Sequence, residues 1–471
     1  MNFQYGRFLF PYLAGELTLR TDANFVLNEI GSADSEYYRF NELFDFVSED
    51  SVDIDSLGEF RYAEIGNVTN TEDVFPVTLN FNFRDELNES YYSKIEKGDI
   101  IKVSNGDILI SKIRPYLQKF ILINEHNSDI YYTSAFIHIR PKFCNKILFY
   151  ALKFIFIKAI NSISRQGKGY PTLSESDLRY LKFDKSIIDC LLNSEELLLS
   201  KIEPLESKVD ELKHKAKSEV DLINEILSTE FDWDFDAFKS LCERKIFSTP
   251  FSNLCKSQDL RFSAKFHRPS GAYVENTILP SHFSRIKHHL EIPICLGASI
   301  SPSDFDSNGN CYYISMASIK NYKVELDDSQ VVSYSFENLP KNHSKKVRKG
   351  DIIMSRSGAA IGKFALVEND CNAIFADFTM RIRLKGVNVK FAYYFFRSAF
   401  FQHLILIYYM GLQNHNIYPY QICEFPFPDI SLEEQDRIVS LIDKQVSVQN
   451  KTISRIANLR NQIIDLIYEN S

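Results

Sequence analysis

The apolar positions in residues 431–471 predict a long amphipathic helix. No glycine or proline interrupts this stretch, and charged or amide side chains occupy most of the positions in between. The apolar side chains recur with the spacing of one helical face, which a single polar residue, Gln449, interrupts. This stripe consists of Ile442, Val446, Ile453, Ile456, Ile464 and Ile467.

A second stretch carries nearly the same stripe, formed by Leu198, Ile202, Leu205, Val209, Leu212, Ala216, Val220 and Ile223. A constant offset of 244 residues places Leu198 on Ile442 and Val209 on Ile453. We therefore predict a duplicated chain in which each copy ends in a long helix. Proline disfavours a helix interior, so the first helix is expected to start or kink at Pro204. The two helices are expected to pack on one another through Leu198, Ile202, Val209, Leu212 and Ile223 on one side and Ile442, Val446, Ile453, Ile456 and Ile467 on the other.

Two matched segments indicate the same duplication. Residues 106–112 read Gly-Asp-Ile-Leu-Ile-Ser-Lys, and residues 350–356 read Gly-Asp-Ile-Ile-Met-Ser-Arg. In each copy a Lys-Phe pair, at Lys119 and at Lys363, begins a second apolar run thirteen residues after the glycine. A Gly-Asp turn, an apolar strand, a polar loop and another apolar strand are typical of a hairpin. Its tip would carry the cationic residues.

The order of these elements predicts an α+β fold. Aromatic-rich amphipathic helices at 149–163 and 391–409 are each followed by a polar loop. We expect two tandem homologous mixed α/β domains, separated and followed by long helices that pack as an antiparallel coiled coil with pseudo-two-fold symmetry. The expected boundaries are 1–186 for the first domain, 187–227 for the central helix, 228–429 for the second domain and 430–471 for the C-terminal helix.

Composition excludes several classes of protein. No run of eighteen clean apolar residues predicts a membrane span, and a signal peptide is not expected, so we expect a cytoplasmic protein. None of the eight cysteines forms a CxxC pair, which argues against zinc and favours reduced thiols. The net charge of −8 neither supports nor excludes DNA binding, because residues 341–363 are locally basic and salt screens distant charges.

Motifs for catalysis are absent. The chain has no phosphate-binding GxxxxGK[ST] loop, no GxSxG elbow, no Asn-Pro-Pro-aromatic motif of an amino-methyltransferase and no Pro-Asp…Glu-x-Lys nuclease pattern. Together these absences argue against an enzyme, and no cofactor or metal is expected for this chain.

The polar loops favour a nucleic-acid-binding module that is used twice. Arginine matches the edge of guanine, asparagine and glutamine match adenine, and cations contact phosphates. For any one of these residues the alternative is a solvated loop charge, and for Lys119 and Lys363, which precede matched strands, it is a structural role. The candidates are Lys112, Arg114, Lys119, Arg165, Lys168, Tyr170, Lys345, Lys346, Arg356, Ser357, Lys363, Gln413, Asn414, His415 and Asn416.

Taken with the duplication, three motifs resemble the DNA-specificity subunit of type I restriction–modification systems. They are the two Gly-Asp hairpins, the Leu-Arg-x-x-Ala-x-Phe openings at 19–25 and 260–266, and the helix start Leu-Glu-Glu-Gln-Asp-Arg-Ile-Val at 432–439. The first long helix departs from the family pattern, because 193–197 lacks the Gln-x-x-Ile signature.

The resemblance implies a non-catalytic subunit with two target-recognition domains, each of which reads one half of a bipartite site on double-stranded DNA. The long helices would act as a spacer and dock two methyltransferase subunits, and restriction subunits would join them. S-adenosylmethionine and ATP would belong to those partners. Because the loops differ between the copies, the target is expected to be asymmetric. A helix of about 25–30 residues spans roughly 40 Å, close to the separation of half-sites about one DNA turn apart.

Two other classes remain open. One is a protein-interaction scaffold or an antitoxin-like regulator that has this fold but does not read DNA. The other is a stand-alone enzyme. Salt-dependent binding to one asymmetric sequence, strengthened by a methyltransferase partner, would distinguish the specificity subunit from the scaffold. Methyl transfer by the purified chain without partners would instead indicate the enzyme.

Overall fold

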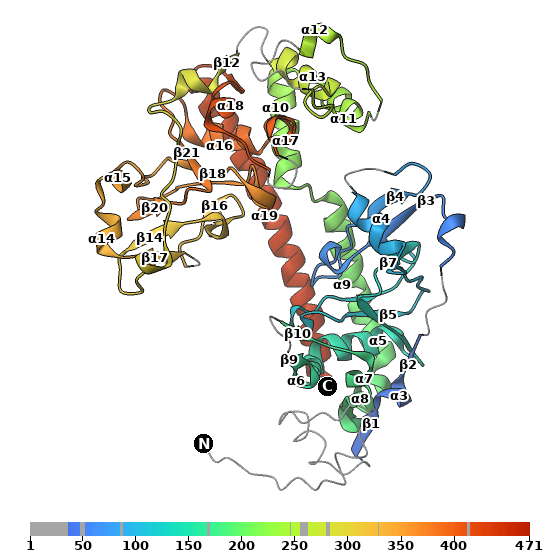
Figure 1. The fold of residues 1–471 in the computed structure, drawn as a ribbon. Coiled ribbons are helices and arrows are strands. Elements are labelled where there is room, and N and C mark those ends of the chain that lie inside the picture. The colour runs from blue at the N-terminus through green and yellow to red at the C-terminus, as the bar shows by residue number, and fades with distance from the viewer. Residues whose placement is uncertain are drawn as a thin grey trace. The chain divides into compact units, whose positions relative to one another are not determined.

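The computed structural model describes residues 36–47, 52–84, 88–166, 170–244, 246–254, 262–278, 283–327, 329–411 and 415–471 (Figure 1). The chain divides into two units. Unit 1 comprises Met1–Lys213 and Arg455–Ser471, and unit 2 comprises His214–Ser454. Residues 19–25, 260 and 261, which belong to the two matched openings, lie outside the described residues.

Unit 1 is built around a four-stranded sheet with the order β2-β8-β5-β6. A second sheet has the order β4-β3-β7, and β1 (Tyr37–Arg39) pairs with β11 (Lys182–Asp184). The strands of the two sheets are β2 (Phe44–Phe46), β3 (Glu59–Ala63), β4 (Val77–Asn80), β5 (Ile108–Ser111), β6 (Phe120–Leu122), β7 (Ile130–Tyr132) and β8 (Phe136–Pro141). The helices include α4 (Glu89–Ile95), α5 (Asn145–Tyr150), η6 (Ala151–Ile155), α6 (Ile157–Ile163), α7 (Glu175–Leu178), α8 (Lys185–Asn193) and α9 (Glu195–Lys215).

Unit 2 contains a six-stranded sheet with the order β13-β21-β18-β19-β16-β15 and a three-stranded sheet with the order β17-β14-β20. Its strands are β12 (Phe283–Arg285), β13 (Cys295–Leu296), β14 (Cys311–Ile314), β15 (Ile319–Lys320), β16 (Lys323–Val324), β17 (Gln330–Val332), β18 (Ile352–Ser355), β19 (Phe364–Leu366), β20 (Ala373–Phe375), β21 (Thr379–Ile382) and β22 (Pro426–Pro428). The helices include α10 (Glu219–Phe231), α11 (Phe235–Glu243), α13 (Pro269–Ile278), α16 (Val389–Arg397), α17 (Ala399–Tyr408), α18 (Pro419–Cys423) and the first part of α19 (Leu432–Glu469).

The same strand pairings recur in both units. In the hairpins that the sequence predicted, Ile108 pairs with Leu122 and Ile352 pairs with Leu366, in antiparallel register. In the second sheets, β3 runs parallel to β7 and β14 runs parallel to β20. Alternate residues of β5 and β18 face two different cores, as expected for strands that are covered on both sides.

A buried aspartate fixes the start of each hairpin. Asp107 and Asp351 have no solvent exposure, and each follows a glycine in the left-handed backbone region, with φ +89° at Gly106 and +87° at Gly350. The Arg140 guanidinium contacts both Asp107 oxygens, at 2.7 and 3.1 Å, and Arg383 contacts both Asp351 oxygens, at 2.6 and 2.7 Å. Each carboxylate also accepts a backbone N–H bond of 2.9 Å from the residue three positions earlier. The Asp of the Gly-Asp turn is therefore a core ion-pair residue.

The first long helix differs from the prediction. α9 begins at Glu195 and continues through Pro204. The helical stretch is interrupted later, at residues 216–218, where the Ser218 side chain caps α10 by accepting a hydrogen bond from the Asp221 N–H. By contrast, α19 runs unbroken. In the part of the chain that the structure describes, no helix combines the length and apolarity needed to cross a membrane.

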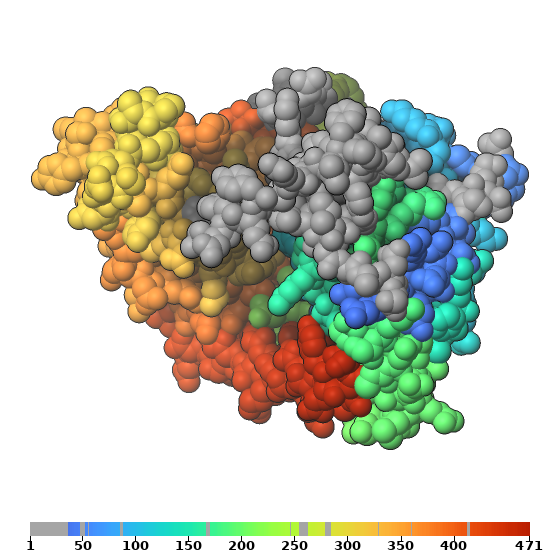
Figure 2. Space-filling model, turned by 90° about the horizontal axis from the view of Figure 1, so that it is seen from below, coloured from blue at the N-terminus to red at the C-terminus, as the bar shows by residue number. Residues whose placement is uncertain are grey.

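Each unit packs its own part of the long helices into its core. In unit 1, Leu198 and Ile202 of α9 share a core with Ile463 and Ile467 of α19. Figure 2 shows the C-terminal end of α19, in red, beside the green helical region near residue 200. In unit 2, Ile223 and Leu227 of α10 share a core with Ile438, Val439 and Ile442 of α19.

The expected packing stripe needs one correction. Ile453 is 51% exposed, whereas the polar Gln449 is only 8% exposed. Buried side chains recur every seven residues at Ile442, Gln449, Ile456 and Ile463, whereas Ile453 lies outside this set and is exposed. The apolar pattern wrongly included Ile453 because apolar character alone does not show which face of the helix is covered. The other expected packing residues are buried (Leu198, Ile202, Val209, Ile223, Ile442, Ile456, Ile467) or partly buried (Leu212, Val446).

The Asp107 ion pair makes a testable contribution to stability. Burial alone would raise the pKa of Asp107, but hydrogen bonds from His138, Arg140 and the Ser104 N–H outweigh burial and hold this pKa at about 2. A carboxyl group with a depressed pKa stabilises the fold above its ordinary pKa. We expect about 2 kcal/mol of stability to be lost as the pH falls from about 4 to about 2.

Urea unfolding at a series of pH values measures this loss. Asp107→Asn should destabilise the protein at neutral pH and remove this part of the pH dependence. Asp129→Asn is the matched control, because the Asp129 carboxylate is 60% exposed in its ion pair with Arg61. An unchanged acid profile in Asp107→Asn would contradict the assignment.

Two isoleucines of α19 test the packing. Ile467 has no solvent exposure and Ile453 is half exposed. Ile467→Ala should cost about 3 kcal/mol because it opens a cavity in the core, and Ile453→Ala should cost less than about 0.5 kcal/mol. Urea denaturation followed by circular dichroism gives both values, and equal losses would contradict the difference in burial between the two side chains.

Candidate nucleic-acid interface

In each unit the tip of the hairpin is joined to the loop that follows the aromatic-rich helices. In unit 1 the Leu173 N–H donates to the Lys112 carbonyl at 2.8 Å, and in unit 2 the Ile417 N–H donates to the Arg356 carbonyl at 2.9 Å. These partners occupy matching positions in the two copies. Residues from two polar loops that are distant in the sequence therefore meet at one surface in each unit.

Lys112 and Arg356 brace this surface. Their backbone N–H groups donate to the carbonyls of Ala135 and Phe378, at 3.0 Å in both cases. The Lys112 ammonium donates to the Ser134 carbonyl at 2.7 Å, and Arg356 Nε donates to the Asp377 carbonyl at 3.0 Å. In each unit this cation therefore holds its hairpin to the equivalent neighbouring turn. Contact of Lys112 and Arg356 with DNA remains a prediction.

Lys119 and Lys363 occupy the same position in the two hairpins but lie in different surroundings. The Lys119 ammonium donates to the Ile65 carbonyl at 2.8 Å, and burial lowers its pKa. The Lys363 side chain is exposed. The structural alternative fits Lys119, whereas Lys363 can contact a phosphate.

Several other candidates have polar partners within the protein. Arg165 pairs with the buried Asp177 at 2.9 Å, Lys346 pairs with Glu337 at 2.7 Å, and the Lys345 ammonium donates to the Leu296 carbonyl at 2.5 Å. These three side chains are therefore engaged in contacts that support the loops.

The second loop of unit 2 is described only in part. His415 Nδ1 lies 3.0 Å from the Gly411 carbonyl oxygen, and its ring packs on Tyr409. The Asn416 side chain accepts a bond of 3.4 Å from Arg356, and the Asn416 backbone pairs with Ser357. Lys168, Gln413 and Asn414 lie outside the described residues.

Arg114 and Tyr170 remain at the surface of unit 1. Both are exposed, and the guanidinium carbon lies 5.0 Å from the centre of the Tyr170 ring. Two exposed aromatic residues beside the hairpin tips were not predicted from the sequence. They are Tyr116, at 48% exposure, and Phe378, at 54% exposure. An aromatic residue within a polar loop was the available signal.

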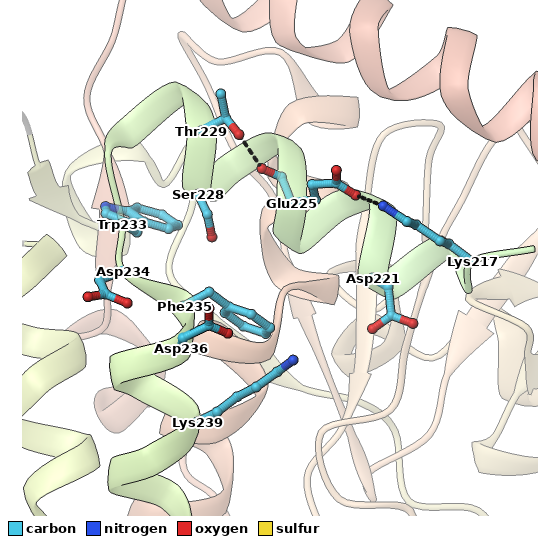
Figure 3. A pocket seen from close by; sticks show the side chains of 10 residues that line it. All are labelled: Lys217, Asp221, Glu225, Ser228, Thr229, Trp233, Asp234, Phe235, Asp236 and Lys239. Atoms are coloured by element: carbon cyan, nitrogen blue, oxygen red, sulfur yellow. Dashed lines mark hydrogen bonds and ion pairs between the residues drawn. The ribbon is translucent and has the colours of Figure 1, made fainter. Parts of the chain in front are cut away.

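A groove between α10 and α11 has the wrong charge for this interface. Its volume is about 680 Å³, and four carboxylates but only two ammonium groups line it (Figure 3). One of these ammonium groups, on Lys217, is paired with Glu225 at 2.5 Å. Among the described residues no group of three or more His, Cys, Asp or Glu side chains is placed to hold a metal ion. The paired loops are therefore the better candidate for contact with phosphates and bases.

Comparison with known proteins defines the class. Residues 290–461 match the family model of the type I restriction modification DNA specificity domain. Residues 290–461 therefore carry a DNA specificity domain of this class, and this match confirms the resemblance to DNA-specificity subunits of type I systems. No curated protein sequence matches the chain.

Solved structures of related systems also align with the chain. One structure is described as the structural basis underlying complex assembly and conformational transition of the type I R-M system. It is 15% identical in sequence, the alignment covers 92% of this chain and 96% of the other, and the TM-score is 0.42. The HsdS subunit from Thermoanaerobacter tengcongensis gives 15% identity, 92% and 95% coverage, and a TM-score of 0.35. The S subunit from M. genitalium gives 12% identity, 92% and 95% coverage, and a TM-score of 0.36. With TM-scores this low, the assignment depends on the family model.

The two matched lysines give a paired test. Lys119→Met should lower stability by about 1 kcal/mol, because it removes the hydrogen bond to the Ile65 carbonyl. Lys363→Met should leave stability unchanged but weaken binding to all DNA sequences and reduce the salt dependence by about one counterion. Urea unfolding and titration of fluorescent duplexes at several salt concentrations measure the two effects. If Lys363→Met lowered stability and Lys119→Met weakened DNA binding, Lys363 would be the structural residue and Lys119 the phosphate contact.

Proposed function

We propose that this chain is a non-catalytic specificity subunit that recognises a bipartite, asymmetric DNA target. Unit 1 reads one half-site and unit 2 reads the other. The observation that carries this proposal is the shared framework with different loops. Both units have the same hairpin register and the same buried aspartate, yet the residues at the hairpin tips differ.

The framework supports recognition because it holds each loop in place before DNA arrives. Lys112 and Arg356 fix the hairpin to a neighbouring turn, and the following loop is hydrogen-bonded to the same residues. A loop held in this way loses little conformational entropy on binding, so its side chains can discriminate between bases. Different side chains on equal frameworks then select different half-sites.

The long helices are proposed to form the antiparallel spacer. Arg437, near the start of α19, pairs with Glu230, near the end of α10, as antiparallel packing requires. The apolar side chains that α9 and α10 share with α19 within each unit support the same arrangement.

The start of α19 is proposed to contribute to methyltransferase docking. Its most recognisable residues are internal. Gln435 is 2% exposed, accepts a bond of 2.8 Å from the Asn388 N–H and donates to the Ile430 carbonyl at 2.9 Å. Ile438 is buried in the core of unit 2. Exposed neighbours such as Leu432 and Glu433 are therefore left for contact with two modification subunits.

The chemistry is proposed to belong to the partners. S-adenosylmethionine would bind to the methyltransferase subunits and ATP to restriction subunits, because this sequence lacks the motifs for methyl transfer and for phosphate binding. The second candidate is a scaffold that assembles the same partners without reading DNA.

Mapping of DNA methylation tests the proposal. Co-expression of this chain with its methyltransferase subunit in a methylation-free host should place methyl groups at one bipartite, asymmetric motif. The methyltransferase alone should leave the same genome unmodified. If the two proteins co-purify but no motif is methylated or bound preferentially, the scaffold is the better description.

A further inference from the structure

The hairpin tips of the two units have the same backbone shape. In unit 1 a short 3₁₀ turn, η5 (Pro115–Leu117), lies between two residues in the left-handed region, Arg114 at φ +52° and Gln118 at φ +53°. In unit 2 the offset of 244 places Gly358, at φ +68°, and Gly362, at φ +78°, at the same two positions. Both loops therefore require a left-handed backbone at these positions.

Unit 1 has side chains where this backbone favours glycine. A non-glycine residue in the left-handed region costs on the order of 1 kcal/mol and persists only where the surroundings impose it. Here the Arg114 N–H donates to the Pro171 carbonyl and the Leu117 N–H donates to the Arg114 carbonyl, both at 2.9 Å. Glycine in unit 2 shows that the fold does not need arginine at this position. The backbone of this turn therefore does not account for the arginine side chain.

The Arg114 side chain is poised for a ligand. It is exposed, and its guanidinium carbon lies over the ring of Tyr170, a residue that is itself 43% exposed. Among the residues that the structure describes, its guanidinium has no hydrogen-bond acceptor, unlike Arg356, which donates to the Asp377 carbonyl. Stacking holds the planar fork in one orientation with its donors unused, which is the arrangement that bidentate recognition requires.

We propose that Arg114, held by the left-handed turn and stacked on Tyr170, is the guanine-reading residue of unit 1. Its fork would donate to O6 and N7 of one guanine in the major groove. The tip of unit 2 carries Gly358 and Ala360 at the positions of Arg114 and Tyr116, so unit 2 reads its half-site from other side chains. The inference depends on the proposed DNA-recognition function and assigns one base preference to one unit.

Selection from randomised duplex DNA by the full chain in complex with its methyltransferase subunits tests this assignment. The wild-type complex should enrich a bipartite site with a fixed guanine in one half. Arg114→Gly and Arg114→Lys should lose the preference at that position and keep the other half-site. Affinity for the wild-type site should fall about tenfold or more, with an unchanged salt slope for Arg114→Lys.

Stability separates this loss from misfolding. Arg114→Gly relieves the left-handed backbone, so its thermal midpoint should equal or exceed that of the wild type while its guanine preference is lost. Tyr170→Ala should weaken the same preference because the fork is no longer held.

Two outcomes would overturn the inference alone. In one, the variants enrich the wild-type site. In the other, Arg114→Lys and Arg114→Gly weaken all sequences equally, which makes Arg114 a phosphate contact. If the wild-type complex enriches no sequence, the proposed DNA-recognition function fails as well.

Discussion

The buried carboxylate at the start of each hairpin is the interaction on which the rest of each unit depends. Asp107 and Asp351 have no solvent exposure, and each lies between a glycine turn and an arginine, Arg140 on β8 or Arg383 directly after β21. A buried charge is tolerated only when its partners satisfy it, so the turn, the hairpin and the arginine strand are fixed together. The Asp–Arg ion pair therefore also fixes the position of the loop at the other end of each hairpin. The two units share that constraint and differ in what the loops display.

Much of the framework could be predicted from the sequence because it depends on local spacing. The equal Gly-to-Lys distance in the two copies predicted both hairpins, and their registers confirm it. The Asp–Arg pairs were not predictable in this way. Arg140 lies on β8 and Arg383 directly follows β21, each more than thirty residues further along the chain than its aspartate, and nothing in the local pattern shows that they face the turn. The prediction that Ile453 packs between the helices was wrong for a related reason. The spacing of apolar residues does not show which face of a helix another element covers.

The candidate site was predictable in residue type but not in role. The sequence placed cations at both hairpin tips, yet Lys112 and Arg356 use their polar groups on backbone carbonyls. Lys119 and Lys363 are identical in type and register, but the Lys119 ammonium donates to the Ile65 carbonyl whereas the Lys363 side chain is exposed. The contrast between Arg114 and Gly358 was present in the sequence, but its meaning depends on the backbone angles.

Unit 1 is assembled from two segments that unit 2 separates in the sequence. Ile463 and Ile467 complete a core whose other buried residues lie between residues 40 and 202. During translation the apolar surface of unit 1 that Ile463 and Ile467 cover therefore stays exposed until unit 2 has been synthesised. A chain that terminates before Ile463 leaves that surface uncovered, which exposes the core of unit 1 to solvent and to proteases. The stability of unit 1 therefore depends on residues that follow unit 2 in the sequence.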